Sequence, residues 1–375
     1  MPYRRGGLLE KLGDMPWLLL MVTTLLLVAG LLMQYSAAGG HWDPYAKAHF
    51  ARMAMGLGLC FTIALVPMVW LARGAYLLYF LGLALLLFVE VNGMMGGGAQ
   101  RWIDLGFMTI QPSEFMKLGM IVALARYYHY LHPDDYHRPR FMVVPLLMII
   151  IPAYLIYRQP NLGTTAILGA IAVCMLFAAG LSARIFWSGI VAILALIPIA
   201  WQFVLHDYHK QRVMTFLDPS ADPLGAGYNI SQSMIAVGSG GAFGKGFVQG
   251  SQGQLNFLPE KHTDFIFTML AEETGFMGAM ALLFLYSVLL LFSLMLMLRS
   301  KNRFGSLISA AICAFFFMHI FINISMVMGL VPVVGVPLPF LSYGGSFLLA
   351  CLMAVGLLIN VYLHRDVSAI RISRL

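Results

Sequence analysis

Long apolar runs recur along the whole chain and constrain its fold more than any other feature. Most runs are close to the roughly 20 residues that a helix needs to cross a bilayer, whereas 263–298 exceeds one span and is expected to begin outside the bilayer or to tilt. Within a bilayer, runs of this kind satisfy their backbone hydrogen bonds as helices. Hydrophobic residues make up 60% of the sequence and charged residues only 10%, against about 25% charged residues in a soluble domain. The expected spans are residues 16–36, 49–70, 74–92, 114–130, 141–157, 161–180, 184–205, 263–298, 304–330 and 340–363.

The sequence therefore predicts an all-α integral membrane protein with about ten transmembrane helices. We expect residues 1–375 to form a single polytopic membrane domain, with one large extracytoplasmic loop at 206–262. Lys and Arg are more frequent in the loops on the N-terminal side, which favours a cytoplasmic location for both termini. No basic stripe is interleaved with aromatic residues, so the sequence does not predict nucleic-acid binding.

A polar stretch at residues 256–267 is the strongest candidate for a functional site. It places Glu260, Lys261, His262 and Asp264 immediately before the long apolar run that reaches Leu298. Ionisable groups at the mouth of a membrane segment are costly to retain, which favours a working site. On the predicted topology this site faces outward, away from the cytoplasm.

The helix after this stretch is expected to begin with Thr263 as its N-cap and Asp264 in its first turn. Thr is a preferred N-cap residue, and the positive end of the helix dipole would keep the carboxylate of Asp264 ionised. An acid that only caps the helix is the alternative interpretation.

A second polar motif opens the fourth run, with Gln111, Ser113, Glu114 and Lys117. Glu114 and Lys117 are three residues apart, so they share a helix face and can form an ion pair. Lys117 also lies one turn inside the span on the same side as Asp264, where it could meet a substrate phosphate. A purely structural ion pair is the alternative. Gln111 and Ser113 are expected to belong to the polar core.

Further basic residues lie in the predicted extracytoplasmic loops. Arg101 precedes a Trp, and the pair could bind an anion or simply anchor the chain at the membrane interface. Lys210, Arg212 and Lys245 are the corresponding candidates in the large loop. The glycine-rich segment 238–253 could present backbone N–H groups to a phosphate or form a re-entrant segment.

Polar residues within the later runs are expected to face the bundle. Glu272 and Glu273 would be costly toward lipid, so we expect both to have partners inside the protein. Interhelical hydrogen bonds account for His319, Asn323 and Ser342 without further function. The four cysteines show no metal-ligand spacing.

Several motifs together resemble one family, the SEDS proteins of shape, elongation, division and sporulation. They occur in the same order over nearly the whole chain, and segments 244–247, 254–260 and 335–339 resemble the elongation branch more than the division branch. The motifs are residues 98–103 (Gly-Ala-Gln-Arg-Trp-Ile), 111–117 (Gln-Pro-Ser-Glu-Phe-Met-Lys), 238–241 (Gly-Ser-Gly-Gly), 258–267 (Leu-Pro-Glu-Lys-His-Thr-Asp-Phe-Ile-Phe) and 339–346 (Pro-Phe-Leu-Ser-Tyr-Gly-Gly-Ser).

The resemblance implies a ten-helix enzyme of the bacterial cytoplasmic (inner) membrane that polymerises lipid II into β-1,4-linked glycan strands and releases undecaprenyl pyrophosphate. It implies work with a class B penicillin-binding protein, a transpeptidase, and with other elongation-complex proteins and membrane lipid. Asp264 then matches the essential catalytic candidate, and Glu114 and Lys117 match functionally important positions. One departure is Asn161, where the family has Asp in the pattern Gln-Pro-Asp-Leu-Gly-Thr.

We expect an inverting glycosyl transfer with Asp264 as general base. Holding a divalent cation, Mg or Mn, against the pyrophosphate is a rival role for the same carboxylate, and no organic cofactor is expected. Two alternatives remain for the chain as a whole. One is a lipid II flippase without chemistry, and the other is a noncatalytic scaffold for the cell-wall synthase.

Overall fold

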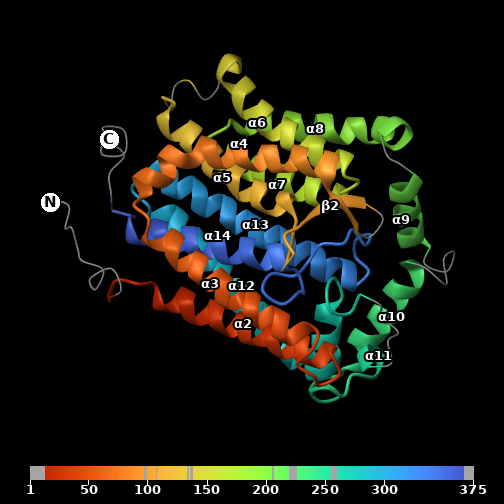
Figure 1. The fold of residues 1–375 in the computed structure, drawn as a ribbon. Coiled ribbons are helices and arrows are strands. Elements are labelled where there is room, and N and C mark those ends of the chain that lie inside the picture. The colour runs from red at the N-terminus through yellow and green to blue at the C-terminus, as the bar shows by residue number, and fades with distance from the viewer. Residues whose placement is uncertain are drawn as a thin grey trace.

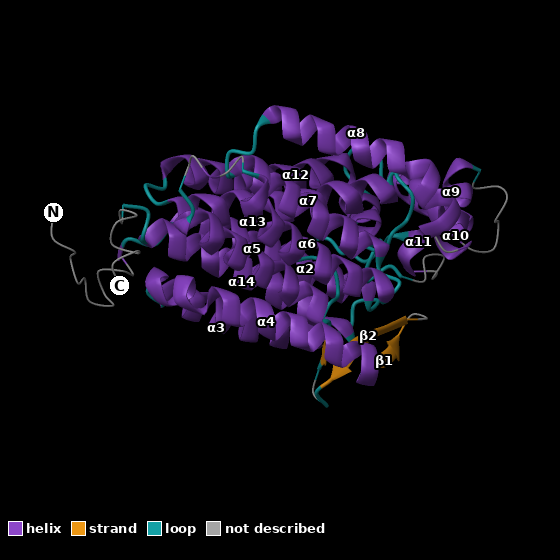
Figure 2. Ribbon diagram, turned by 90° about the horizontal axis from the view of Figure 1, so that it is seen from above, coloured by secondary structure: helices purple, strands orange, loops and turns teal. Residues whose placement is uncertain are grey.

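The structure is a computed structural model that describes residues 13–96, 99–106, 108–132, 135, 138–204, 207–218, 226–254 and 260–366. It is mainly helical, and its helices run nearly side by side in one bundle (Figures 1 and 2). The helices are α2 (Trp17–Ala37), α3 (Tyr45–Leu65), α4 (Met68–Asn92), α5 (Pro112–Tyr130), α6 (Pro139–Arg158), α7 (Leu162–Ala178), α8 (Ala183–Ile199) with the π-helical η2 (Ala200–Val204), α9 (Asp207–Leu217), α10 (Ala226–Ser239), α11 (Ser251–Gln254), α12 (Ile266–Arg299), α13 (Arg303–Val327) and α14 (Gly345–Leu363).

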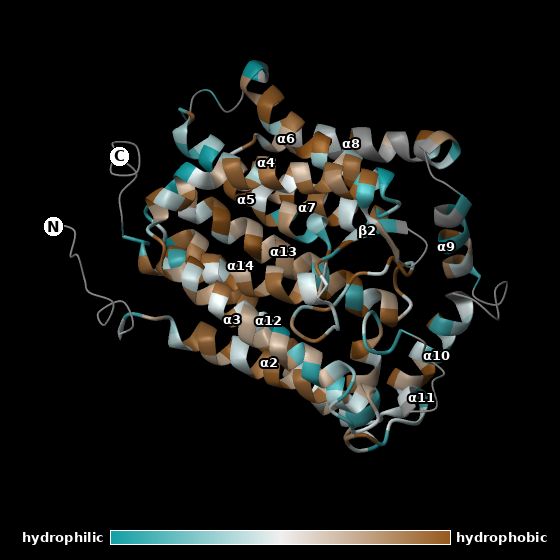
Figure 3. Ribbon diagram, in the orientation of Figure 1, coloured by the Kyte–Doolittle hydropathy of each residue, from teal (hydrophilic) through white to brown (hydrophobic). Residues whose placement is uncertain are grey.

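Every apolar run expected from the sequence coincides with a helix, from α2 through to α14. Among the described residues, seven helices are long and apolar enough to cross a membrane. Hydrophobic residues predominate along the helices (Figure 3), and Trp17, Phe80 and Phe284 are among the large apolar side chains left exposed. A surface of this kind is suited to lipid. The helical membrane fold is thus confirmed, while the count of ten spans stays a prediction.

Helices α13 and α14 form the centre of the bundle. Most of α14 is buried, and it packs most extensively against α3, whereas α13 packs against α12, α7 and α5. Gly356 allows the close approach of α14 to α3, because a Cβ atom there would lie 2.6 Å from the carbonyl oxygen of Cys60. Small residues at such crossings are the usual means by which membrane helices pack closely.

A small antiparallel sheet, which the all-α prediction did not include, projects from one end of the bundle (Figure 2). Its strands β1 (Met94–Gly96), β2 (Ala99–Asp104) and β3 (Thr109–Ile110) follow one another in the order β1-β2-β3. Ile103 of β2 pairs with Ile110 of β3, directly before the start of α5. The sheet therefore fixes β2 beside the first turn of α5.

The glycine-rich segment before α12 packs against a break in that helix. Gly275 has a φ of 68°, which interrupts the helical hydrogen bonds of α12. The N–H groups of Lys245 and Gly246 instead donate to the carbonyl groups of Glu272 and Glu273, both at 3.0 Å. Because these N–H groups are already bonded within the protein, they are not offered to a phosphate.

The start of α2 and the end of α14 lie at the same end of the bundle (Figure 1). Strand β2 and the short helices α9, α10 and α11 lie at the opposite end. The cavity of the candidate site lies at this end of the bundle, beside β2.

Candidate active site

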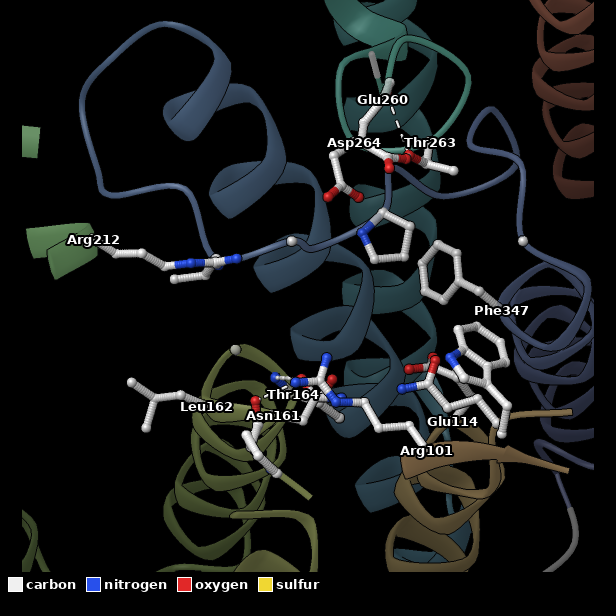
Figure 4. A pocket seen from close by; sticks show the side chains of 18 of the residues that line it. Arg101, Glu114, Asn161, Leu162, Thr164, Arg212, Glu260, Thr263, Asp264 and Phe347 are labelled. Atoms are coloured by element: carbon white, nitrogen blue, oxygen red, sulfur yellow. Dashed lines mark hydrogen bonds between the residues drawn. The ribbon is translucent and has the colours of Figure 1, made fainter. Parts of the chain in front are cut away.

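A cavity of about 570 Å³ lies between segments that are far apart in the sequence. Strand β2, the start of α5, the turn between α6 and α7, helix α9, and the loops before α12 and α14 all contribute to its wall (Figure 4). Its lining residues are Arg101, Trp102, Gln111, Glu114, Pro160, Asn161, Leu162, Gly163, Thr164, Arg212, Val213, Glu260, Thr263, Asp264, Pro332, Val334, Gly335, Pro337, Tyr343, Gly344 and Phe347.

The turn before α12 holds Asp264 at this cavity, with its carboxylate pointing inward (Figure 4). Two buried side chains fix the main chain of the turn. Asn323 Nδ2 donates to the carbonyl oxygen of Asp264 at 2.9 Å, and Ser342 Oγ donates to that of Thr263 at 2.7 Å. The place of the carboxylate is therefore set by α13 and by the loop before α14.

Asp264 does not lie in the first turn of a helix, so the predicted capping arrangement is wrong. Helix α12 begins at Ile266 with Phe265 as its N-cap. Thr263 Oγ1 donates to Glu260 Oε2 at 2.8 Å and caps no helix. The expected helix-dipole effect on the carboxylate is lost with this geometry.

The electrostatic consequence is a pKa shift opposite to the expected one. Burial, reinforced by the negative charge of Glu260, raises the pKa of Asp264 to about 6, although Arg212 opposes the shift. A carboxyl group with this pKa is mostly ionised at neutral pH and still basic enough to accept a proton.

Two arginines that the sequence suggested stand at the cavity wall. Arg101 of β2 donates from Nε to the carbonyl oxygen of Gln159 at 2.7 Å and also bonds the carbonyl of Pro160. Arg212 of α9 donates to the carbonyl oxygen of Val333 at 2.7 Å. These bonds tie each guanidinium to a neighbouring loop, where its charge can meet an anionic ligand.

The predicted ion pair of α5 is present, with Lys117 Nζ 2.8 Å from Glu114 Oε2. Glu114 lines the cavity, whereas Lys117 is fully buried behind it. The ammonium group also lies 2.9 Å from His319 Nε2 and 5.3 Å from the centre of the Phe315 ring. The expectation that Lys117 meets a phosphate directly does not fit this position. Lys117 reaches the cavity through neighbouring side chains, which include Glu114, His319 and Phe347.

Other residues predicted for the site divide between the cavity and its support. Gln111 and Glu260 line the cavity. The backbone N–H of Gln111 donates to Ser346 Oγ at 2.7 Å, which joins the start of α5 to α14. Ser113 is buried beside this junction, and Ser342 supports the Asp264 turn as described.

The two consecutive acids of α12 lie outside the cavity lining and have the partners that the sequence predicted. Glu272 is buried and its Oε1 lies 2.7 Å from Lys245 Nζ. Glu273 is also buried and accepts a hydrogen bond from Ser36. Lys245 is thus part of a structural ion pair that holds the glycine-rich segment on α12.

Three further predicted residues also lie outside the lining. Lys261 Nζ donates to the carbonyl oxygen of Gly253 at 2.7 Å. The His262 ring stacks on Tyr45 with 4.4 Å between ring centres. Burial lowers the pKa of both Lys261 and His262. Lys210 Nζ is 4.0 Å from Asp207 at the start of α9.

Comparison with known proteins identifies the chain. The family model described as "Cell cycle protein", which covers FtsW, RodA and SpoVE, matches residues 16–367. The chain belongs to this family. The resemblance seen in the sequence motifs is therefore confirmed.

Known members of the family are similar to this chain over nearly its whole length. Peptidoglycan glycosyltransferase MrdB of Escherichia coli K12 is 41% identical over 349 residues, which are 91% of this chain and 93% of that protein. A chain from a structure on the coordination of polymerization and crosslinking by a peptidoglycan synthase complex has a TM-score of 0.82 and 30% identity, covering 94% of this chain and 99% of that chain. The Rod shape determining protein RodA of Thermus thermophilus has a TM-score of 0.68 and 26% identity, covering 94% and 98%.

One cavity residue is an asparagine where the resemblance led us to expect an aspartate. Asn161 is the N-cap of α7, and its side-chain oxygen accepts from the N–H of Thr164 at 3.3 Å. Asn and Asp cap helices about equally well. The asparagine therefore keeps the cap but brings no carboxylate to the cavity wall.

Sequence reasoning missed the importance of His319 and Asn323, which it assigned to ordinary interhelical hydrogen bonds. Both contact residues of the site, as the distances to Lys117 and Asp264 show. The signal was two polar side chains one helical turn apart in an otherwise apolar run. Their targets lie in other segments and could not be read from that spacing.

Proposed function

We propose that Asp264 is the general base of a glycosyl transfer that takes place in this cavity. The chain is a peptidoglycan glycosyltransferase of the FtsW, RodA and SpoVE family, and its reaction needs an acceptor for the proton of an attacking sugar hydroxyl. The observation that carries the assignment is the cavity-facing carboxylate of Asp264, whose pKa burial raises to about 6. General-base catalysis typically contributes about 10²–10⁴-fold to a rate.

The proposed reaction joins two lipid-linked saccharides. The 4-hydroxyl oxygen of one lipid II molecule forms a bond to C1 of the terminal sugar of a second, lipid-linked chain. The bond between C1 and the pyrophosphate oxygen breaks, undecaprenyl pyrophosphate leaves, and the configuration at C1 inverts. The hydroxyl proton passes to the carboxylate of Asp264, which later returns it to solvent.

The charges of the cavity support a role for the arginines with the leaving group. Arg101 and Arg212 bring positive charge, while Lys117 already neutralises Glu114. We propose that the two guanidinium groups stabilise the pyrophosphate as it departs, because donors aimed at developing charge lower the barrier. The carboxylates of Glu260 and Asp264 offset much of this positive charge, so a pyrophosphate calls for further cationic charge.

A divalent cation, Mg or Mn, fits this requirement. Among the residues that the structure describes, no group of three His, Cys, Asp or Glu side chains could hold a metal ion. Mg²⁺ commonly binds through one or two carboxylates together with substrate phosphates. Glu260 is the side chain that would hold such a cation, and Asp264 would join it only in the rival role, in place of accepting the proton. The cation would supply charge neutralisation on the leaving group. No organic cofactor is proposed.

The chain is a multi-pass membrane protein, and we propose the bacterial cytoplasmic membrane as its location, with both termini inside and the cavity facing outward. The common end of α2 and α14 supports termini on one side (Figure 1). We also propose that a class B penicillin-binding protein is its partner during cell elongation. The similarity to a chain of a synthase complex that couples polymerization with crosslinking supports this pairing.

The test is polymer formation from lipid II by the purified protein, with a divalent cation and the penicillin-binding partner present. Asp264→Asn should fold and yield no polymer. Asp207→Asn is the matched control, because its fully exposed carboxylate lies on α9, outside the cavity lining. Polymer from Asp264→Asn at the wild-type rate would refute the assignment. Lipid II translocation without polymer from the wild type would favour a flippase.

A further inference from the structure

The C-terminal part of α13 carries two buried polar residues whose contacts reach both walls of the cavity. His319 and Asn323 are four residues apart, so they lie one above the other on one helix face. Both are almost completely buried, at 1% and 0% exposure. Polar side chains in such a place are costly unless they are bonded, and their bonds here lead to the site.

Asn323 forms a hydrogen bond to the main chain of the Asp264 turn. Its Nδ2 donates to the carbonyl oxygen of Asp264 at 2.9 Å and to that of Val336 at 2.7 Å. An amide nitrogen has two protons, so these bonds account for its full donor capacity. One side chain thus joins the turn before α12 to the loop before α14.

His319 connects the same loop to the ion pair of α5. Its Nε2 lies 2.9 Å from Lys117 Nζ, and its Nδ1 lies 3.3 Å from the carbonyl oxygen of Pro337. An ammonium group can only donate and a carbonyl oxygen can only accept. The imidazole is therefore neutral, with its proton on Nδ1 and its lone pair on Nε2.

These contacts form one continuous series between opposite walls of the cavity. It runs from Glu114 through Lys117 and His319 to Pro337, whose neighbour Val336 shares Asn323 with the Asp264 turn. Glu114 lies on one wall and Asp264 on another (Figure 4). The links are buried or half-buried, so this series of contacts can hold the two carboxylates at a fixed separation.

We propose that His319 and Asn323 are positioning residues, which hold the Asp264 turn in place relative to the Glu114–Lys117 pair. This proposal rests on the proposed function of Asp264. It assigns Lys117 a part in the reaction that requires no contact with substrate, because the buried ammonium orients His319 and through it the loop at Pro337. A misplacement of about 1 Å in a catalytic group can cost about 10²-fold in rate.

The first test compares two buried asparagines with the same kind of bonding. Asn323→Leu removes the bonds to the Asp264 turn. Asn360→Leu is the control, because Asn360 is also fully buried and its Nδ2 shares its two protons among the carbonyl oxygens of Ile63, Ala64 and Val66, at 2.9, 3.2 and 2.6 Å. Asn360 lies near the far end of α14 from the cavity.

We expect Asn323→Leu to lower kcat for polymerisation by about 10²-fold with little change in KM, because the side chains that would contact the substrate stay in place while the Asp264 turn shifts. Asn360→Leu should lower the unfolding temperature but leave kcat and KM at wild-type values. Equal kcat losses in the two variants, or a loss in Asn323→Leu that appears in KM and not in kcat, would overturn the proposal.

The second test uses His319, in case Asn323→Leu does not fold. His319→Gln retains an acceptor for Lys117 and a donor for Pro337, whereas His319→Leu retains neither. We expect Gln to restore most of the kcat that Leu loses. Equal rates in these two variants would overturn the proposal. If Asp264→Asn abolishes polymer while both tests fail, only the positioning role falls. If Asp264→Asn remains active, the proposed function itself falls.

Discussion

The pH dependence of polymerisation should report the surroundings of Asp264. The pKa of this carboxyl group is raised from 3.8 to about 6. At pH 7 about nine tenths of the groups are then ionised, and at pH 5 about one tenth. Because only the ionised form accepts a proton, kcat should fall about tenfold between pH 7 and pH 5.

The fall of kcat toward low pH is the acidic limb of the pH profile. Two substitutions should move this limb in opposite directions. Arg212→Gln removes a positive charge that favours the ionised form, so the pKa of Asp264 and the limb should both rise. Glu260→Gln removes a negative charge that disfavours it, so both should fall. A nearby charge typically changes a pKa by about 1 unit or more. Lys210→Gln is the control for Arg212, because it lies on the same helix but outside the cavity lining.

The assay is the initial rate of glycan polymer formation from lipid II between pH 5 and pH 8, at fixed cation concentration and with the partner present. Circular dichroism at each pH checks that the protein remains folded. A limb centred near pH 4, or a limb that Arg212→Gln and Glu260→Gln move in the same direction, would refute the reasoning. A limb moved by Lys210→Gln would show that net charge, not the cavity, controls it.

Further predictions concern stability, backbone conformation and the cation. Lys117→Met leaves Glu114 buried without its cation, so we expect a loss of about 3–5 kcal/mol in folding stability, seen as a lower unfolding temperature; an unchanged temperature would contradict it. Gly335→Ala puts a side chain at a φ of 71°, which costs about 1–2 kcal/mol. Its Cβ would lie 3.4 Å from Asp264 Oδ2, so kcat should fall in the polymerisation assay. A wild-type kcat would argue against this contact. Chelation by EDTA should stop polymer formation until Mg²⁺ or Mn²⁺ is added back, whereas full activity in EDTA would exclude the proposed cation.

The spacing of residues along the sequence was enough to predict the helices and one buried ion pair. Runs of about 20 apolar residues predicted helices because a bilayer offers no other partner to the backbone. The three-residue spacing of Glu114 and Lys117 predicted their ion pair, since such residues share a helix face, and they lie 2.8 Å apart. The cost of charge toward lipid predicted buried partners for Glu272 and Glu273, which are Lys245 and Ser36.

The local rules failed where the surroundings of a residue come from distant segments. Asp264 was expected to be stabilised as an anion by a helix N-terminus. The helix begins two residues later, and burial with Glu260 raises its pKa instead. The position of Lys117 inside a span suggested contact with a phosphate, but the packing of α13 places His319 between it and the loop.

By itself, the sequence determined that this chain is a helical membrane protein of the FtsW, RodA and SpoVE family, and it predicted a site near Asp264. These properties depend on composition, helical period and motifs, which are local. Only the tertiary structure decided which of the predicted residues share the cavity, how deeply Asp264 is buried, and what His319 and Asn323 contact. The bond from Lys117 to His319 spans 202 residues of sequence, and contacts over such distances follow from how the helices pack, which no spacing along one helix encodes.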